Sequence, residues 1–225
     1  MMREIEFEVN YYKYLLGLLF FLPTLISAME FKPAGISEHG CDSLPLGGIC
    51  VTILASGGIE PGDAVALKKV IEKIEKSDKL SIQVGEIWLD SKGGHVRESM
   101  EIGRYIRSRQ QGTFVTHDSV CASACVLAYV GGVSRFAVGP MMIHSFYSKE
   151  FEGTGNFAQA SKKYDDMAAE VEKYLKEMRI TKNLLDQMMT IPHFQAKTLS
   201  FEEMEGLGLI GLDPVYAQTR KRKTR

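Results

Sequence analysis

The stretch VCASACVLAYVGG, residues 120–132, decides how the rest of this chain is interpreted. It sets Ser123 between two alanines and two cysteines, then runs into a short apolar helix that Gly131 and Gly132 are expected to end. A strand is expected just before it, so Ser123 stands where a strand gives way to a helix. A serine in that position is either an ordinary small residue at a helix start or a hydroxyl delivered to a reaction.

Segments with strand and helix patterns alternate on both sides of this stretch. Apolar runs with β-branched residues predict strands at 48–56, 85–91 and 112–117, with one or two more within 134–146. One-sided apolar spacing predicts helices at 61–76, 93–110, 156–179 and 181–190, and a one-turn helix with a final strand at 199–211. This alternation with short connections predicts an α/β fold with parallel strand pairing.

Length and composition fit one ordinary globular domain. The chain has 225 residues, of which 45% are hydrophobic and 24% charged, and its formal net charge is −1. That charge gives no indication of nucleic-acid binding. Residues 29–218 are predicted to form the domain, beginning with a loop over 29–47 that is rich in Gly, Pro and Ser. The basic run TRKRKTR at 219–225 is predicted to be a solvated, disordered tail.

The first 28 residues differ from the rest. Residues 11–28 are apolar apart from Lys13, contain Pro23, and end in the small residues Ser27 and Ala28. The run is short for a membrane-spanning helix, which needs about 20 apolar residues. It has the form of a secretory signal peptide with cleavage after Ala28, and an uncleaved N-terminal membrane anchor is the alternative. Either outcome predicts a protein that is periplasmic or membrane-anchored facing the periplasm.

Four cysteines follow that segment, an even number that permits disulfides in an exported protein. Cys41 and Cys50 flank the turn-rich loop CDSLPLGGIC, which makes a bridge between them plausible. The helix start expected between Cys121 and Cys125 makes a mutual bridge awkward, so these two are predicted to be small buried hydrophobic residues. No paired CxxC motif or histidine cluster indicates a metal site, and no cofactor is predicted.

Two further segments contain groups that could serve a reaction at Ser123. LDSKGG at 89–94 ends a strand with a glycine pair, which suits an oxyanion site and equally any tight strand-to-helix turn. A serine needs a base to take its proton. His117 is the nearest in sequence, and His144 within MMIHSF is the second candidate. A histidine after an apolar run is also often structural.

Taken in order, these segments resemble the Clp protease proteolytic subunit and its exported relatives in the ClpP/crotonase superfamily. The matching segments are DSKGG at 90–94, CASACVLAYVGG at 121–132, MMIHSF at 141–146 and LSFEEMEGLGLIG at 199–211. The resemblance extends over roughly residues 48–213, and its specificity lies in the ordered set. It implies a ClpP/crotonase-like spiral of repeated β-β-α units with an extra protruding helix.

The resemblance also implies an activity and a site. Ser123 would be the nucleophile and His144 the general base, with the backbone N–H groups of Gly94 and Ala124 forming the oxyanion hole. The chain would then be an exported, ATP-independent serine endopeptidase acting on polypeptides without a cofactor. The helix at 156–179 corresponds in position to the one through which the family's subunits associate, which implies a homo-oligomer.

Two positions depart from the family pattern. Lys92 replaces the proline of the usual Ser-Pro-Gly-Gly turn. The segment TIPHFQAKTLS at 190–200 contains no acid where the family has its third catalytic residue, an aspartate. The residue that orients His144 is therefore unknown from the sequence. Alternatives are the acids Asp165, Asp166 and Asp186, or a Ser–Lys dyad in which Lys162 or Lys163 is the base.

Two other functions remain open at this point. The chain could keep the fold as a catalytically weak or inactive protein that acts in binding or scaffolding. It could also be a crotonase-type acyl-CoA enzyme, which shares the superfamily and uses a similar pair of backbone donors. Export disfavours the second alternative because coenzyme A is cytoplasmic.

Overall fold

The computed structural model describes residues 28–36, 41, 48–76, 81–146 and 157–223. Its larger sheet has six strands, of which β2, β3, β4 and β6 run parallel while β1 and β9 add antiparallel edges. In sheet order these strands are β1 (Glu30–Ile36), β2 (Ile49–Ser56), β3 (Ile82–Asp90), β4 (Gly112–Val115), β6 (Ser134–Ala137) and β9 (Gly211–Leu212). A smaller sheet contains β5 (Cys121–Ala122), β7 (Met141–Ile143) and β8 (Lys197–Thr198).

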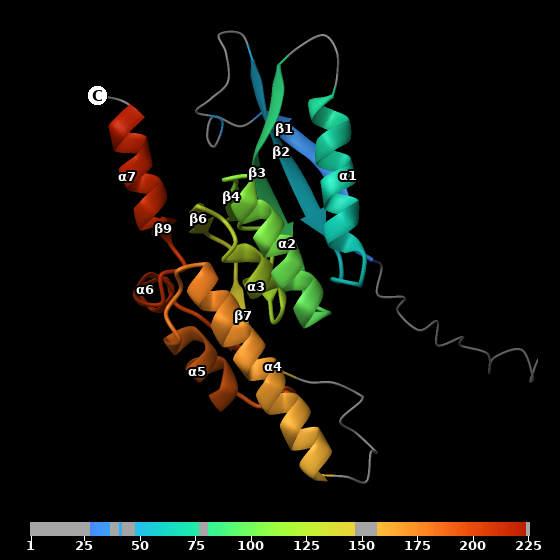
Figure 1. Cartoon of the computed structure of the whole chain (residues 1–225), viewed down its shortest axis with the longest axis vertical. Helices are drawn as coiled ribbons and strands as arrows, with labels where there is room; N and C mark the ends of the chain where they lie inside the picture. Colours follow the sequence, from blue (N-terminus) through green and yellow to red (C-terminus); the bar gives the residue numbers. More distant parts are fainter. Residues whose placement is uncertain (1–27, 37–40, 42–47, 77–80, 147–156, 224–225) are drawn as a thin grey trace, which may run out of the picture.

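The helices pack beside these sheets (Figure 1). They are α1 (Asp63–Glu75), α2 (Val96–Ser108), α3 (Cys125–Tyr129), α4 (Phe157–Glu177), α5 (Asn183–Thr190), α6 (Phe201–Gly206) and α7 (Pro214–Lys223). Helix α2 lies between α1 and α3, and α4 runs alongside α5 with one end extending away from the sheets (Figure 1). The mixed α/β class predicted from the sequence is confirmed.

Consecutive parts of the chain repeat one β-β-α pattern. A strand of the large sheet is followed by a short extended segment and then by a helix, as in β4–β5–α3 and β6–β7–α4. The short segments of successive units pair in parallel through Ile59–Gly94, Ser91–Cys121 and the β5–β7 ladder. The predicted spiral of β-β-α units is therefore present, with α4 as the protruding helix. We call these short paired segments the second layer. They bring the connections that precede successive helices side by side.

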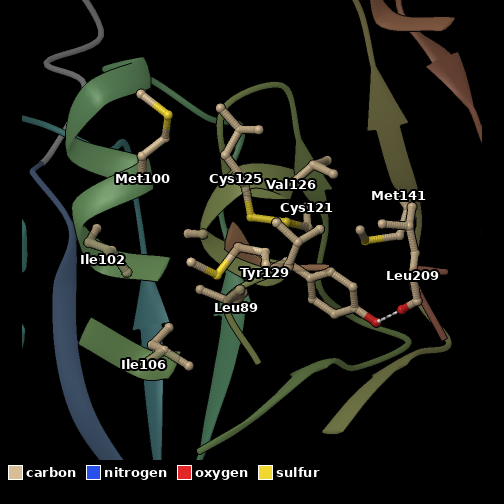
Figure 2. Close-up of a cluster of buried hydrophobic side chains, with 14 of the residues drawn as sticks. Leu89, Met100, Ile102, Ile106, Cys121, Cys125, Val126, Tyr129, Met141 and Leu209 are labelled. Atoms are coloured by element: carbon tan, nitrogen blue, oxygen red, sulfur yellow. Dashed lines mark hydrogen bonds between the residues drawn. A yellow bond between two sulfur atoms is a disulfide. The ribbon is translucent and has the colours of Figure 1, made fainter. Parts of the chain in front are cut away.

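The core fills the space between the large sheet and α2, α3 and α4. Strand β2, ICVTILAS, is apolar apart from Thr52 and Ser56, and four of its residues are buried while the other four are partly exposed. Tyr129 and Tyr174 are fully buried, and each hydroxyl donates to a backbone carbonyl, of Leu209 at 2.8 Å and of Leu127 at 2.6 Å. Figure 2 shows the Tyr129–Leu209 bond within the apolar cluster. Burial raises the pKa of both tyrosines, so both act as neutral donors.

The prediction of a loop over 29–47 is wrong for its first part. Residues Glu30–Ile36 form β1, which pairs antiparallel with β2 and has a register shift between Pro33 and Gly35. An edge strand needs hydrogen bonds on one side only, and therefore tolerates the proline and glycine that suggested a loop. Residues 37–40 and 42–47 lie outside the described residues.

The prediction of a disordered basic tail is also wrong as far as Lys223, because α7 covers Pro214–Lys223. The Asp213 carboxylate accepts hydrogen bonds from the N–H groups of Val215 and Tyr216, as an N-cap does. Pro214 follows at the first helical position, where a missing N–H costs nothing. These two start signals outweigh the charge of the run that follows.

The predicted signal peptide or anchor, residues 1–28, lies outside the described residues except for Ala28. Ala28 forms a parallel bridge with Gly58, and Met29 is buried in the core. None of the helices in the described part of the chain combines the length and the apolar character needed to cross a membrane.

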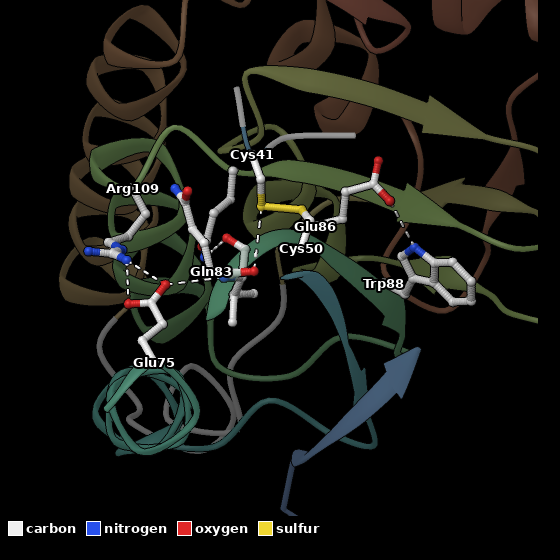
Figure 3. Close-up of a disulfide and its surroundings, with 9 residues drawn as sticks. Cys41, Cys50, Glu75, Gln83, Glu86, Trp88 and Arg109 are labelled. Atoms are coloured by element: carbon white, nitrogen blue, oxygen red, sulfur yellow. Dashed lines mark hydrogen bonds and ion pairs between the residues drawn. A yellow bond between two sulfur atoms is a disulfide. The ribbon is translucent and has the colours of Figure 1, made fainter. Parts of the chain in front are cut away.

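The disulfide between Cys41 and Cys50 joins the segment after β1 to the start of β2. Figure 3 shows it beside β3, where the Cys41 Sγ lies 3.4 Å from the carbonyl oxygen of Gln83. The bridge plausible from the CDSLPLGGIC loop is thus present in the structure.

Candidate active site

Ser123 has a backbone conformation that is rare for a residue with a side chain. Its φ angle is 56°, in the left-handed region. The turn is closed on both sides: the Ser123 N–H donates to the carbonyl of Met142 at 2.8 Å, and the Ser123 carbonyl accepts from the N–H of Val126 at 3.1 Å. A left-handed serine between β5 and α3 is the kind of local strain that concentrates at functional sites.

The Ser123 side chain also differs from its neighbours in exposure. Every other residue from 121 to 133 is buried, whereas Ser123 is partly exposed. Ser123 is therefore the one partly exposed residue of an otherwise buried segment. A serine that merely began a helix would not need this combination of exposure and left-handed backbone.

A disulfide joins Cys121 to Cys125 across the Ser123 turn, which corrects the prediction of two unbridged hydrophobic cysteines. The prediction of burial holds, since both side chains are 0% exposed. A regular helix starting at Ser123 would make the bridge awkward. The helix starts at Cys125 instead, and the left-handed residue before it brings the two Cα atoms to 5.3 Å.

The glycine pair of the SKGG segment packs directly against this turn. Gly93 and Gly94 have φ angles of +98° and +146°, which side chains rarely adopt. A Cβ on Gly93 would lie 2.8 Å from the Ser123 Cβ and 3.0 Å from the Ala124 nitrogen. The turn after β3 and the turn before α3 are therefore in contact, and the contact leaves no room for a side chain at Gly93.

The second layer aligns the other candidate residues with Ser123. Ser91, Cys121 and Met141 are paired across neighbouring units. Three positions after each of them stand, respectively, Gly94, Ala124 and His144. The Gly93 N–H donates to the Ser91 hydroxyl, but the N–H groups of Gly94 and Ala124 donate no hydrogen bond to any described residue. Two unengaged donors thus stand on neighbouring segments.

His144 follows β7 directly and is partly exposed, unlike the buried Ile143 and Ser145 on either side. Its Nδ1 lies 2.8 Å from the carbonyl oxygen of Ser145. A carbonyl oxygen can only accept, so Nδ1 carries the proton and donates it. With the proton on Nδ1, the Nε2 atom of an uncharged ring carries the lone pair that a general base requires.

Ser145, whose carbonyl accepts from His144, is itself held by the backbone. Its N–H donates to the Ile191 carbonyl at 2.8 Å. On α4, the hydroxyl of Tyr164 donates to the Sδ atom of Met189 at 3.3 Å, and burial raises the pKa of this tyrosine. The contact with His144 was not predictable from residue types, because the acceptor is a main-chain atom.

The other candidate base lies elsewhere. His117 is largely exposed, and its Nε2 lies 3.0 Å from the carboxylate of its neighbour Asp118. Its segment follows β4 and precedes β5, outside the paired connections of the second layer. His117 is therefore a surface residue in an ordinary polar contact.

Within the described part of the chain, no hydrogen bond or ion pair joins His144 to the alternative orienting acids and lysines. Lys162, Lys163, Asp165 and Asp166 are exposed on α4, and Asp186 on α5 forms an ion pair with Lys182. Among the described residues, the Ser145 carbonyl is the hydrogen-bond partner found for the His144 ring. Within the same residues, no group of three His, Cys, Asp or Glu side chains could hold a metal ion.

Comparisons with known proteins agree with this architecture. No protein-family model matches the chain, and no curated protein matches its sequence. Among the solved structures that do match is a single-residue mutant of ClpP1 from Listeria monocytogenes. It has a TM-score of 0.51 and 19% sequence identity, covering 71% of this chain and 88% of that chain. Together with the repeated β-β-α units, this similarity shows that the chain has a ClpP-like α/β fold.

Proposed function

We propose that this chain is a serine endopeptidase in which Ser123 is the nucleophile and His144 the general base. One observation carries the proposal: Ser123 is the partly exposed residue of a left-handed turn, and Gly94, Ala124 and His144 stand at equivalent positions of adjoining segments. This arrangement supplies a hydroxyl, a base and two main-chain donors from neighbouring β-β-α units.

The chemistry follows from these groups. The Nε2 atom of His144 takes the proton of the Ser123 hydroxyl as its oxygen attacks a peptide carbonyl carbon. The N–H groups of Gly94 and Ala124 donate to the oxyanion of the tetrahedral intermediate, where loss of one such donor typically costs about 10²–10³ in rate. The protonated imidazole then gives its proton to the leaving amine, and water hydrolyses the acyl-enzyme by the same steps.

The carbonyl of Ser145 orients the His144 ring in place of the carboxylate that the family pattern would supply. It holds the Nδ1 proton and so keeps the tautomer that a base needs, whose loss costs about 10⁴ in rate in an Asp-containing triad. A neutral carbonyl stabilises the imidazolium less than a carboxylate does. The enzyme should therefore be slower than one with a full triad.

A fluorophosphonate probe tests this proposal because it reacts with activated serines. We expect it to label the wild-type protein and the Ser108→Ala variant, which removes an exposed serine of α2. It should not label Ser123→Ala, and His144→Ala should be labelled far more slowly. A folded wild-type protein that is never labelled would contradict the proposal and favour a binding or scaffolding role on the same fold.

We also propose that the protein is exported and works without an ATP-driven partner. The apolar run at 11–28 and the pairing of all four cysteines support export, since disulfides persist in oxidising compartments. Its substrates would then be small or unfolded polypeptides. Fractionation of cells expressing the full chain tests the location, and recovery in the cytoplasm with reduced cysteines would contradict it.

We further propose a homo-oligomer, with α4 contributing to the contact. The second half of α4 is anchored by the buried Val171, Tyr174 and Leu175, whereas its first half is mostly exposed and extends from the body (Figure 1). Sedimentation measurements should give a mass at least twice that of the subunit, which is 25.1 kDa if the full chain is kept. A monomer at all concentrations would contradict this proposal without affecting the chemistry above.

A further inference from the structure

The Cys121–Cys125 disulfide encloses the residue proposed as the nucleophile. Ser123 stands midway between the two cysteines, so the bridge closes a covalent ring around the Ala122–Ser123–Ala124 turn. The other disulfide, Cys41–Cys50, lies at the start of β2 and takes no part in this turn. The two bridges therefore differ in what they can control.

The turn needs restraint, and the two backbone hydrogen bonds of Ser123, with Met142 and Val126, supply only part of it. A left-handed conformation is unfavourable for serine and persists only when the surroundings enforce it. Ala122 and Ala124 have side chains too small to hold the turn by packing. The glycine pair at 93–94 leaves room for it, but steric room alone does not select one backbone conformation.

The bridge is well placed to provide that restraint because its ends are fixed. Both cysteines are 0% exposed. Cys121 belongs to β5, which pairs with β7, while Cys125 is the first residue of α3. Figure 2 shows their sulfur atoms in the apolar cluster between Met100 of α2 and Met141 of β7. The cross-link thus ties a strand end to a helix start, with Ser123 as the residue between them.

We propose that the Cys121–Cys125 disulfide is a positioning element that holds the Ser123 hydroxyl in its reactive orientation. This inference rests on the proposed serine nucleophile and adds a residue pair that the catalytic step itself does not use. Its kinetic consequence is specific: without the bridge, Ser123 spends only part of its time in the left-handed turn. The rate of covalent reaction should fall, while affinity for a reagent bound by the rest of the site should change little.

The test compares two double variants with wild type. Cys121→Ala/Cys125→Ala removes the bridge around Ser123, and the matched control Cys41→Ala/Cys50→Ala removes the remote one. Fluorophosphonate labelling is followed over a range of probe concentrations to separate the maximal rate, kinact, from the half-saturating concentration, KI. We expect the first variant to lose about tenfold or more in kinact with KI unchanged, and the control to keep both constants.

Further measurements separate lost positioning from lost folding. Circular dichroism and thermal unfolding identify a temperature at which each variant is folded, and end-point labelling counts the competent sites. A merely destabilised protein would show fewer labelled sites with a normal kinact. Cys121→Val/Cys125→Ala, which refills part of the lost volume without a cross-link, replaces the first variant if that one does not fold.

The outcomes distinguish a failure of the positioning role from a failure of the proposed peptidase function. Labelling of wild type with an unchanged kinact in the bridge-less variant would overturn the positioning role and leave the nucleophile intact. A wild-type protein that is never labelled would overturn the proposed function itself. An equal loss of kinact in the Cys41–Cys50 control would also contradict the inference, because the effect would then not be local to Ser123.

Discussion

At the scale of the residue, the candidate site depends on backbone conformations that the amino-acid types only partly indicate. The sequence identified Ser123, His144 and the SKGG glycines as candidates, because each residue type suits one part of acyl transfer. It could not indicate that Ser123 is left-handed, because serine rarely is. The Cys121–Cys125 bridge was missed for the same reason, since it forms only around that turn.

Gly93 is the position where a single methyl group should do the most damage. A Cβ there would lie 2.7 Å from the Ala122 carbonyl oxygen and 2.8 Å from the Ser123 Cβ, in a backbone with φ of +98°. We expect Gly93→Ala to lower the labelling rate of Ser123 at least about 100-fold and to reduce stability by about 1–3 kcal/mol.

The matched control for that change is Gly206→Ala in α6, where a Cβ meets nothing within 4 Å. It should leave labelling unchanged and leave stability unchanged or slightly higher. Labelling kinetics and urea unfolding measure both effects. Normal labelling of a folded Gly93→Ala protein would show that the contact between the two turns does not shape the site.

At the scale of the element, the periodic patterns located most strands and helices to within a few residues. The exceptions have local causes: β1 contains Pro33 and Gly35, which an edge strand tolerates, and the α7 start signals at Asp213–Pro214 were overlooked beside a basic run. The pairing of the short second-layer segments was beyond sequence patterns. Segments as short as β5 have no measurable periodicity, and their partners lie about 20–35 residues away.

Asp213 is the element-scale contact that holds the C-terminal part of the chain to the helices. Its carboxylate is 0% exposed and binds Arg107 at 2.8 Å and Arg179 at 3.0 Å. Burial by itself would raise its pKa, but hydrogen bonds from the Tyr216 N–H and both guanidinium groups outweigh that effect and lower it. We expect Asp213→Asn to cost about 3–5 kcal/mol at neutral pH, since it leaves two arginines without their partner.

The pH dependence of that loss has a defined sign. A carboxyl group whose pKa is lower in the folded state stabilises the protein above its ordinary value of 3.8, and this contribution disappears as pH falls through the folded value. The difference in free energy of unfolding between wild type and Asp213→Asn should therefore become smaller below about pH 4. Urea unfolding measures it, with the exposed Asp118→Asn as control. A gap that stays constant down to about pH 3 would contradict the assignment.

At the scale of the whole molecule, the order of the segments carried more information than any one of them. A Gly-Gly turn, an embedded serine, a histidine after a strand and a closing GLGLIG segment fit one fold only when taken together. The spiral explains why order matters. Each segment occupies the same step of a successive β-β-α unit, so residues about 20–35 positions apart become neighbours.

The two disulfides act at this largest scale as well, because each restricts the unfolded chain. The Cys41–Cys50 bridge closes a loop with a sequence separation of 9, for which chain-entropy arguments give about 2–3 kcal/mol. Cys41→Ala/Cys50→Ala should lose that much free energy of unfolding in urea and show a larger m-value, since the unlinked denatured chain is more expanded. The site lies in a different part of the fold, so labelling of folded molecules should persist.

An unchanged urea midpoint would mean that native contacts such as that of Cys41 with Gln83 oppose the entropic gain. The stability of the domain and the geometry of the Ser123 turn would then be set by different covalent links, one acting mainly on the unfolded chain and the other on the folded site.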